Sequence, residues 1–220
     1  GWAQARAAFA DARIGWAMWL SFAAILAFSA FETMFVWFGL ANFPEKFGIT
    51  SVIERATRDE VFDAARFSGR YLFFIGLISA VIQGGFIRRL VGRYGETRLA
   101  IVGPLLLGIG LVVVGSATSF WVVILGCVVM PFGFGVNNPS VNALISRASP
   151  ADQQGAYLGV QQSLLSLARM IGPALAGLLY DYRGSRSPFF AAAALLLGAT
   201  LFAYAYHRRF AASFAAKAEH

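Results

Sequence analysis

Residues 99–146 read LAIVGPLLLGIGLVVVGSATSFWVVILGCVVMPFGFGVNNPSVNALIS, without a single charged side chain. A helix needs about 20 apolar residues to cross the hydrocarbon core of a bilayer. The stretch is too long for one such helix and long enough for two. Near its middle lies the polar run Gly115-Ser116-Ala117-Thr118-Ser119. We therefore expect two membrane spans joined by a short turn at this run.

The rest of the chain has a similar composition. Hydrophobic residues make up 58% of the 220 residues and charged residues only 13%, against about 25% in soluble domains. The mean hydropathy is +0.65. Four further apolar runs could cross a membrane, at residues 14–43, 71–87, 149–180 and 187–209. The sequence therefore predicts an all-α integral membrane protein with six transmembrane helices.

Capping signals predict where two of these helices begin. Ser149 is the expected N-cap of the fifth helix, with Pro150 at the first helical position and Asp152 at the third. Thr57 and Glu60 form a capping box. The second helix is therefore expected to begin well before residue 71.

The basic residues predict the orientation. The net charge is +7, but Lys and Arg lie in short clusters between apolar runs, which is the pattern of the positive-inside rule rather than of nucleic-acid binding. One side holds ten Lys/Arg against four Asp/Glu, in residues 1–13, 88–98, 147–152 and 207–220. The other side holds seven against six, in residues 44–70 and 181–186. We expect a multi-pass protein of the plasma (inner) membrane with both termini in the cytoplasm.

No pattern in the sequence points to a catalytic site, a metal or a cofactor. The single cysteine, Cys127, lies in an apolar run and is interpreted as a packing residue. His207 is expected at a helix end and His220 is terminal, so neither can serve as a base at membrane depth. We expect no enzymatic activity.

A repeat links the two halves of the chain. RRLVGRYGETR (88–98) precedes the third span and GLLYDYRGSR (177–186) precedes the sixth, with Gly95 matching Gly184. The offset equals three spans, and three-helix units repeated head to tail must cross the membrane in opposite orientations. Inverted repeats of this kind are typical of secondary transporters. Chance similarity between Leu-rich helices is the alternative.

Two stretches resemble the major facilitator superfamily. GGFIRRLVGRYGETRLAIVGPLLLGIGL (84–111) resembles its eighth and ninth helices, and Arg93, Gly95 and Arg98 resemble the second copy of its cytoplasmic signature, G-x-x-x-D-R-x-G-R-R. The acidic position of that signature falls here on Gly92. SPADQQGAYLGVQQSLLSLARMIGPALAGLLYD (149–181) is similar to the eleventh helix of the drug:proton antiporter branch.

The resemblance covers six of the family's usual twelve helices, and so implies one half-domain. We expect a cytoplasmic linker end at residues 1–13, the transmembrane half-domain at 14–209 and a cytoplasmic tail at 210–220. The expected partners are an N-terminal six-helix half, membrane lipid and a small-molecule substrate. The implied function is alternating-access transport, with proton-coupled efflux of amphipathic compounds favoured. A sugar or organic-anion importer, or a non-transport membrane protein such as a scaffold, remains as the alternative.

Glu32 is the main candidate for a functional residue. It lies within LAFSAFETMFVWFG (26–39), where a carboxylate at mid-membrane costs at least about 2.5–3.5 kcal/mol. Helical spacing places four neighbours near its face: Phe28, Ser29, Thr33 and Phe35. Arg169 on the fifth helix is the other expected charge at membrane depth, and the family fold implies that the first and fifth helices are adjacent. Glu32 either pairs with Arg169 or faces the cavity alone as a proton carrier.

The remaining candidates come from the fourth and fifth helices. Pro131, Gly133 and Gly135, followed by Asn137-Asn138-Pro139, suggest either a broken helix at a cavity or a plain kink. The family fold implies that Asn138 and Asn142 line that cavity. A polar and small-residue stripe on the fifth helix faces other helices or water; its members are Gly155, Gly159, Gln162, Ser166, Arg169 and Pro173.

Overall fold

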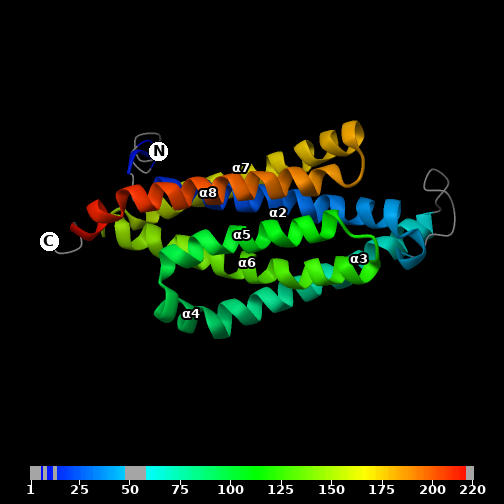
Figure 1. Cartoon of the computed structure of the whole chain (residues 1–220), viewed down its shortest axis with the longest axis horizontal. Coiled ribbons are helices and arrows are strands. Elements are labelled where there is room, and N and C mark those ends of the chain that lie inside the picture. Colours follow the sequence, from blue (N-terminus) through cyan, green and yellow to red (C-terminus); the bar gives the residue numbers. More distant parts are fainter. Residues whose placement is uncertain (1–5, 7–8, 12–13, 48–57, 217–220) are drawn as a thin grey trace.

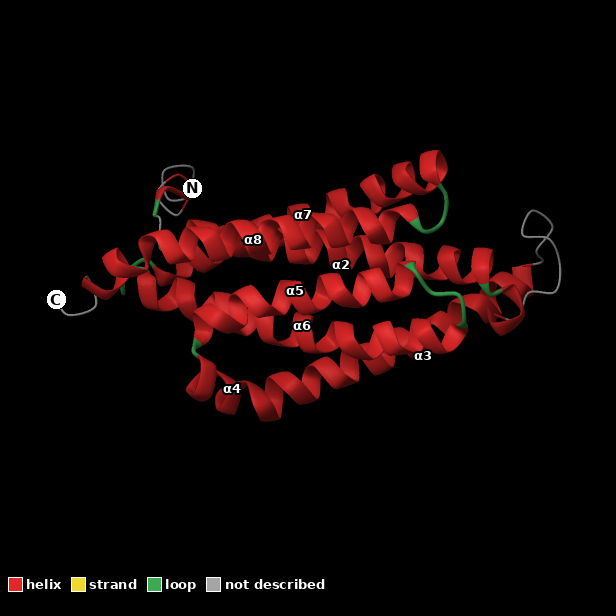
Figure 2. Ribbon diagram, in the orientation of Figure 1, coloured by secondary structure: helices red, strands yellow, loops and turns green. Residues whose placement is uncertain are grey.

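The computed structural model describes residues 6, 9–11, 14–47 and 58–216, and the regular structure within these ranges is helical (Figure 1; Figure 2). The α-helices are α2 (Gly15–Asn42), α3 (Arg58–Val81), α4 (Ile87–Tyr94), α5 (Glu96–Gly115), α6 (Phe120–Ala148), α7 (Gln154–Arg183) and α8 (Ser187–Ala216). A 3-10 helix, Pro44–Phe47, follows α2, and a π-helical turn, Ile82–Phe86, joins α3 to α4.

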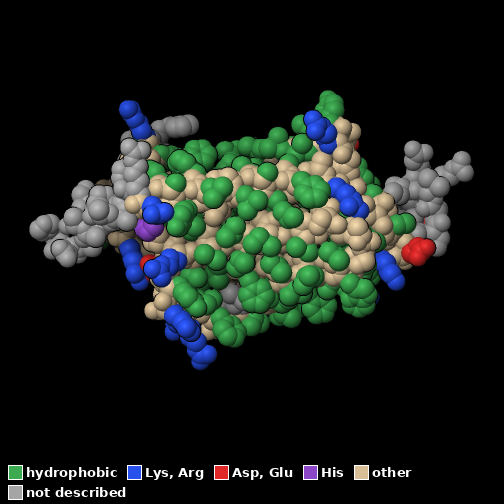
Figure 3. All heavy atoms as spheres, in the orientation of Figure 1, with side chains coloured by type: hydrophobic (Ala, Val, Ile, Leu, Met, Phe, Trp, Pro, Cys, Tyr) green, Lys and Arg blue, Asp and Glu red, His purple; other side chains and the backbone are tan. Residues whose placement is uncertain are grey.

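Within the described ranges, six helical units are long and apolar enough to cross a membrane; α3, the π-turn and α4 together form one of them. The uncharged stretch 99–146 divides into α5 and α6, with the turn where the polar run predicted it. Apolar side chains cover the middle of the face shown in Figure 3, while Lys and Arg side chains gather toward its two ends. The chain is a multi-pass membrane protein, and the predicted six spans are confirmed.

The two ends of the bundle are named here after their loops. The Gly95 end holds the α4–α5 turn, the α6–α7 connection and the start of α2 (Figure 1). The Gly184 end holds the α7–α8 turn, the α5–α6 turn and the end of α2. Successive spans therefore run in opposite directions between these two ends.

Helix packing has the symmetry of an inverted repeat. The first helix of one repeat, α2, packs against α7 and α8, and the first helix of the other, α6, packs against α3 and α5. The third helices of the two repeats, α5 and α8, pack against each other. Each repeat thus completes its core with helices of the other one.

The two turns matched by the repeat have the same backbone geometry. Gly95 has φ 78° and Gly184 has φ 86°, a region that favours glycine because it has no Cβ atom. Each glycine ends a helix by donating its N–H to the carbonyl four residues earlier, that of Val91 at 2.9 Å or Tyr180 at 2.8 Å. This shared geometry supports the predicted correspondence between the two loops.

Glycines bring helix backbones into close contact at two places. Between α5 and α6, a Cβ atom on Gly133 would lie 2.5 Å from the Leu107 amide nitrogen, and one on Gly103 would lie 2.8 Å from the Gly133 carbonyl oxygen. Between α2 and α7, a Cβ on Gly172 would lie 2.9 Å from the Leu26 carbonyl oxygen. Small residues allow such approaches in membranes, where tight packing contributes to helix association.

Two predicted helix boundaries were wrong, and one open alternative was decided. Ser149 does not cap α7, which begins at Gln154; instead it follows α6, where its hydroxyl donates to the Ile145 carbonyl at 2.7 Å. Of the two alternatives for residues 131–139, the broken helix is excluded, because α6 continues to Ala148 through both of its internal prolines. Helix α8 continues past residue 209 to Ala216. The Thr57 capping signal lies outside the described residues, although α3 does begin before residue 71.

Candidate functional site

A cavity of about 450 Å³ opens between α2, α3, α6 and α7. It combines two ionisable side chains with polar and aromatic ones. Its lining residues are Phe28, Glu32, Leu72, Ile75, Gly76, Ser79, Ala80, Gln83, Phe134 and Arg169. The cavity therefore contains both charges that were predicted at membrane depth.

Glu32 and Arg169 reach the cavity from adjacent parallel helices. Both side chains are exposed in this chain, and Arg169 is near enough to act electrostatically on the Glu32 carboxyl. The two nevertheless form no ion pair with each other. Close to these two side chains, α2 and α7 are held together by a hydrogen bond from the Ser29 hydroxyl to the Arg169 carbonyl at 3.3 Å. Gly172 makes the close backbone contact beside this bond. A carboxylate, which can bind a proton, and a guanidinium, which can bind an anion, thus face one cavity.

Two stacked aromatic rings form an apolar wall of the cavity. Phe28 of α2 and Phe134 of α6 lie with ring centroids 4.3 Å apart and planes inclined by 21°. Phe134 stands between Gly133 and Gly135, where the close approach of α5 and α6 fixes the helix that carries it. The sequence predicted Phe28 as a site residue but not Phe134. The position of Phe134 between two glycines was the signal that could have indicated it.

The opposite wall comes from α3 and the π-turn. A π-turn inserts one residue into the helical ladder, and such turns occur often at functional sites. Here it contains Gln83, Gly84 and Gly85, with Gln83 lining the cavity. Ser79, one turn earlier, is buried, and its hydroxyl has no hydrogen-bond partner among the described residues. Ser79 was not predicted, because nothing in the sequence fixes which face of α3 is turned inward.

The other three candidates from α2 lie outside the cavity. Ser29 is buried against α7, as described above. The Thr33 hydroxyl donates to the Ser29 carbonyl at 3.0 Å. Phe35 is fully buried, with its ring centroid 5.2 Å from that of Phe31 and 6.4 Å from that of Tyr71. The structure therefore brings Phe28 and Glu32 together and separates them from these three.

The asparagines of α6 lie nearer the Gly95 end. The buried Ser21 hydroxyl lies 3.3 Å from the Asn137 side-chain oxygen and 3.4 Å from that of Asn138. Asn137 is also bonded through its amide nitrogen to the Ala100 carbonyl at 3.1 Å, which ties α6 to α5. Asn138 and Asn142 are half-buried and do not line the cavity.

Helix α7 carries two adjacent glutamines, one with a buried and one with an exposed side chain. Gln162 is exposed outside the cavity, and its carbonyl accepts a hydrogen bond from the Ser166 hydroxyl at 3.0 Å. The neighbouring Gln161 is fully buried, and its side-chain amide has no partner among the described residues. These described ranges also contain no group of three His, Cys, Asp or Glu side chains that could hold a metal ion.

The signature loop has an ion pair that was not predicted. Arg93, Gly95 and Arg98 are exposed at the Gly95 end. Between them Glu96 is only 9% exposed and accepts a 3.0 Å salt bridge from Arg147 in the last turn of α6. The sequence did contain a signal for this ion pair, because the acidic Glu96 directly follows the glycine of the R-x-G motif.

The Gly184 end has an uncharged contact in the corresponding place. Ser185 directly follows Gly184, and its hydroxyl oxygen accepts a 3.0 Å hydrogen bond from Asn42, the last residue of α2. Arg186 then donates to the Asn42 side-chain oxygen at 3.3 Å and to the Ala117 carbonyl at 3.0 Å. Each repeat's loop is thus joined to the end of the other repeat's first helix.

Comparisons with known proteins agree with this architecture. The mouse Major facilitator superfamily domain-containing protein 10 is 32% identical over 130 residues, which cover 59% of this chain and 28% of that protein. Mouse Solute carrier family 22 member 18 is 29% identical over 123 residues, covering 53% of this chain and 28% of that protein. The crystal structure of the human organic anion transporter MFSD10 (TETRAN) superposes with a TM-score of 0.61 at 25% identity, covering 81% of this chain and 40% of that one.

The chain thus spans well under half the length of these relatives. The profile of the Major Facilitator Superfamily itself matches residues 21–219, nearly the whole chain. With its six spans and inverted repeat, the chain belongs to the Major Facilitator Superfamily of membrane transporters.

Proposed function

We propose that this chain forms the C-terminal half of a secondary active transporter that moves amphipathic small molecules by alternating access, coupled to protons. The observation that carries the proposal is the pair of unpaired charges, Glu32 and Arg169, facing one cavity at membrane depth. Each charge costs at least about 2.5–3.5 kcal/mol at the centre of a membrane span. A protein keeps such charges where a substrate or a proton uses them.

The chemistry of the lining favours a substrate with an acidic group on an apolar body. The Phe28–Phe134 stack offers an apolar surface, and Arg169 offers a planar set of donors that suits a carboxylate, sulfonate or phosphate. Gln83 and Ser79 add polar contacts on the opposite wall. The similarity to a solved organic anion transporter supports the same substrate class.

Glu32 is the proposed proton carrier. Its carboxylate faces the same cavity as the substrate and has no ion-pair partner, so proton binding and substrate binding there influence each other through charge. This mutual influence would couple proton movement to substrate movement. Efflux is the proposed direction, with both termini in the cytoplasm of the plasma (inner) membrane.

The proposed partner is an N-terminal six-helix half. Helices α3 and α7 have long apolar faces that are open in this chain: Phe73 is 66% exposed, Phe74 58% and Met170 70%. Both helices also line the cavity, so a second half packed against them would close it. The relatives that are more than twice as long support this arrangement.

Transport by the protein reconstituted with its N-terminal half tests the proposal. With an imposed pH gradient, we expect uptake of an anionic amphipathic dye into inverted vesicles and little uptake of a glucose analogue. Glu32→Gln should abolish the response to the gradient while substrate exchange at equal pH persists, and Arg169→Gln should abolish both. Glu45→Gln, on an exposed residue of the Pro44–Phe47 helix, is the matched control.

Two outcomes would contradict the proposal. Normal proton-driven transport in Glu32→Gln would exclude Glu32 as the carrier. Transport of the glucose analogue in preference to the dye would favour a sugar importer, the second candidate within the same superfamily.

A further inference from the structure

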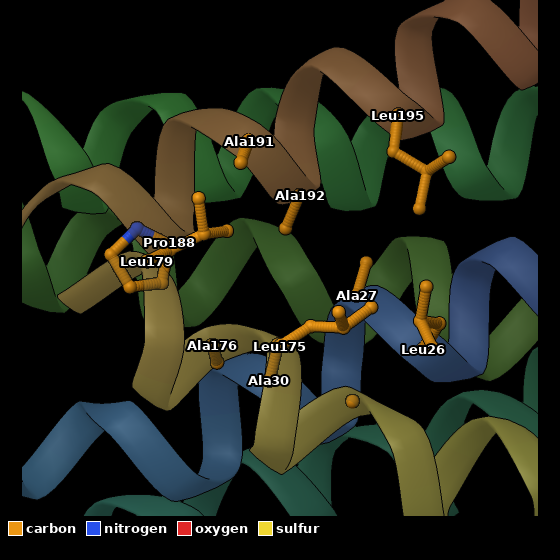
Figure 4. A pocket seen from close by; sticks show the side chains of 11 residues that line it. Leu26, Ala27, Ala30, Leu175, Ala176, Leu179, Pro188, Ala191, Ala192 and Leu195 are labelled. Carbon is orange, nitrogen blue, oxygen red and sulfur yellow. The ribbon is translucent and has the colours of Figure 1, made fainter. Parts of the chain in front are cut away.

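A second hollow lies outside the proposed transport cavity, between α7 and α8, with α2 as its floor. Its volume is about 190 Å³. In Figure 4 Leu179 and Pro188 stand at one end of this groove and Leu26 and Leu195 at the other, with alanines of all three helices between them. Every residue that lines it is Ala, Leu, Gly or Pro.

The lining determines what can fill the groove. Ordered water in a protein needs two to four polar partners, and the side chains here supply none. The groove also lies within membrane-spanning parts of its three helices, where the surrounding solvent is hydrocarbon. An apolar chain is therefore the occupant that matches it.

The groove and the stripe of α7 that continues it to Arg183 together match one lipid leaflet in length. Leu175, Leu179 and Arg183 follow each other at four-residue intervals, so they form one stripe along α7. From Gly172, the deepest lining residue of α7, to Arg183 is eleven residues, or about 16 Å at the rise of an α-helix. This is about half of the roughly 30 Å hydrocarbon thickness. The lining of the groove on α7 covers the first seven of these residues, from Gly172 to Leu179 or about 10 Å, and the stripe continues from there to Arg183 at the end of the span.

A free cation stands at the headgroup end of this stripe. Arg183 is exposed in the last turn of α7, and it makes no hydrogen bond or ion pair within the part of the chain that the structure describes. Asp181, two residues earlier, lies on a different face of the helix. Tyr182, 83% exposed, is of the type that sits at membrane interfaces. Arg186, in contrast, is held by Asn42 and Ala117.

We propose that this groove binds one acyl chain of an anionic phospholipid whose phosphate is held by Arg183. The apolar lining accepts the chain, the span of one leaflet sets its length, and the unpartnered guanidinium selects a negative headgroup. The site is separate from the cavity that contains Glu32, and it depends only on the chain lying in a membrane.

Native mass spectrometry of the protein purified from membranes tests the site, with phosphatidylglycerol and phosphatidylcholine as probes. We expect tighter binding of phosphatidylglycerol. Arg183→Gln should weaken that binding about fivefold, to the level of phosphatidylcholine, since a basic residue near anionic headgroups contributes about one such factor. Arg183→Lys should retain the preference. Inorganic phosphate should not compete, because it lacks the acyl chain.

The apolar part has its own matched pair of variants. Ala191→Phe places a ring in the groove, and Ala194→Phe places the same ring on an exposed face of α8 that does not line it. We expect Ala191→Phe to remove the tightly bound lipid of either type and Ala194→Phe to retain it. Equal binding in these two variants, or equal binding of the two lipids with no effect of Arg183→Gln, would overturn the proposal. Loss of association with another protein chain, with lipid binding unchanged, would assign the groove to a protein contact instead.

Discussion

Replacing Gly133 by alanine tests whether the contact between α5 and α6 is as close as the structure indicates. The new Cβ atom would lie 2.5 Å from the Leu107 amide nitrogen and 3.1 Å from the Leu107 Cα, and it would also collide with the Gly103 carbonyl. Ordinary contacts begin near 3.5 Å. The two helices would therefore have to separate by about 1 Å.

The energetic outcome is the difference between two opposing effects. Alanine stabilises a helix by about 1 kcal/mol relative to glycine. Overpacking costs about 1–3 kcal/mol, and the upper part of that range applies here because the atoms in the way belong to backbones that have no alternative rotamer. We expect a net loss of about 1–2 kcal/mol, which lowers the melting temperature by about 2–8 °C for a chain of this size.

A thermal-stability assay of the detergent-purified protein, followed by size-exclusion chromatography, measures the shift. The control is Gly198→Ala in α8, because a Cβ atom there meets nothing within 4 Å while the gain in helix propensity is the same. The control should be as stable as the parent or slightly more so. A Gly133→Ala protein that melts with the control, or above it, would refute the close contact.

Three further predictions concern charges. Because Glu32 and Arg169 form no ion pair, Glu32→Gln and Arg169→Gln should each insert and express normally; a GFP fusion that loses fluorescence in either single variant and regains it in the double variant would show that they are coupled. Arg147→Gln should destabilise the protein by about 1–2 kcal/mol, less than for a fully buried pair because Arg147 is largely exposed; an unchanged melting temperature would argue against the pair. A cysteine at Arg93 should react with an impermeant maleimide only from the cytoplasm, and labelling from the opposite side would reverse the topology.

The number of spans could be predicted because it depends on composition alone. A run of 48 uncharged residues, 99–146, leaves no other solution in a bilayer, and its polar centre fixes the turn. The repeat was also visible, because Gly95 and Gly184 occupy backbone positions that other residues adopt with difficulty. Both signals are local to the chain.

The cavity lining could be predicted only in part, because helical phase depends on neighbours. Glu32 and Phe28 reach the cavity, whereas Ser29 turns toward α7. The difference of one residue rotates a side chain by about 100°, and the nearly uniform apolar character of α2 offers no stripe from which to choose. The prediction that Ser149 caps the fifth helix was wrong for a related reason. A serine between two helices can form a hydrogen bond with either of them, and here its partner is the carbonyl of Ile145 in α6.

The same fold position holds contacts of different chemistry at the two ends of the bundle. At the Gly95 end, the residue after the glycine is Glu96, which pairs with Arg147 of the other repeat. At the Gly184 end it is Ser185, which accepts a hydrogen bond from Asn42. Charge-assisted hydrogen bonds are roughly twice as strong as neutral ones. At the Gly184 end Arg186 adds such charge-assisted bonds, to Asn42 and to the Ala117 carbonyl. The inverted repeat therefore supplies one joint at each end of the bundle, and each joint contains an arginine. A half-domain that rocks as a unit requires its two repeats to remain joined at both ends, and the cavity charges Glu32 and Arg169 lie between these joints, on helices of different repeats.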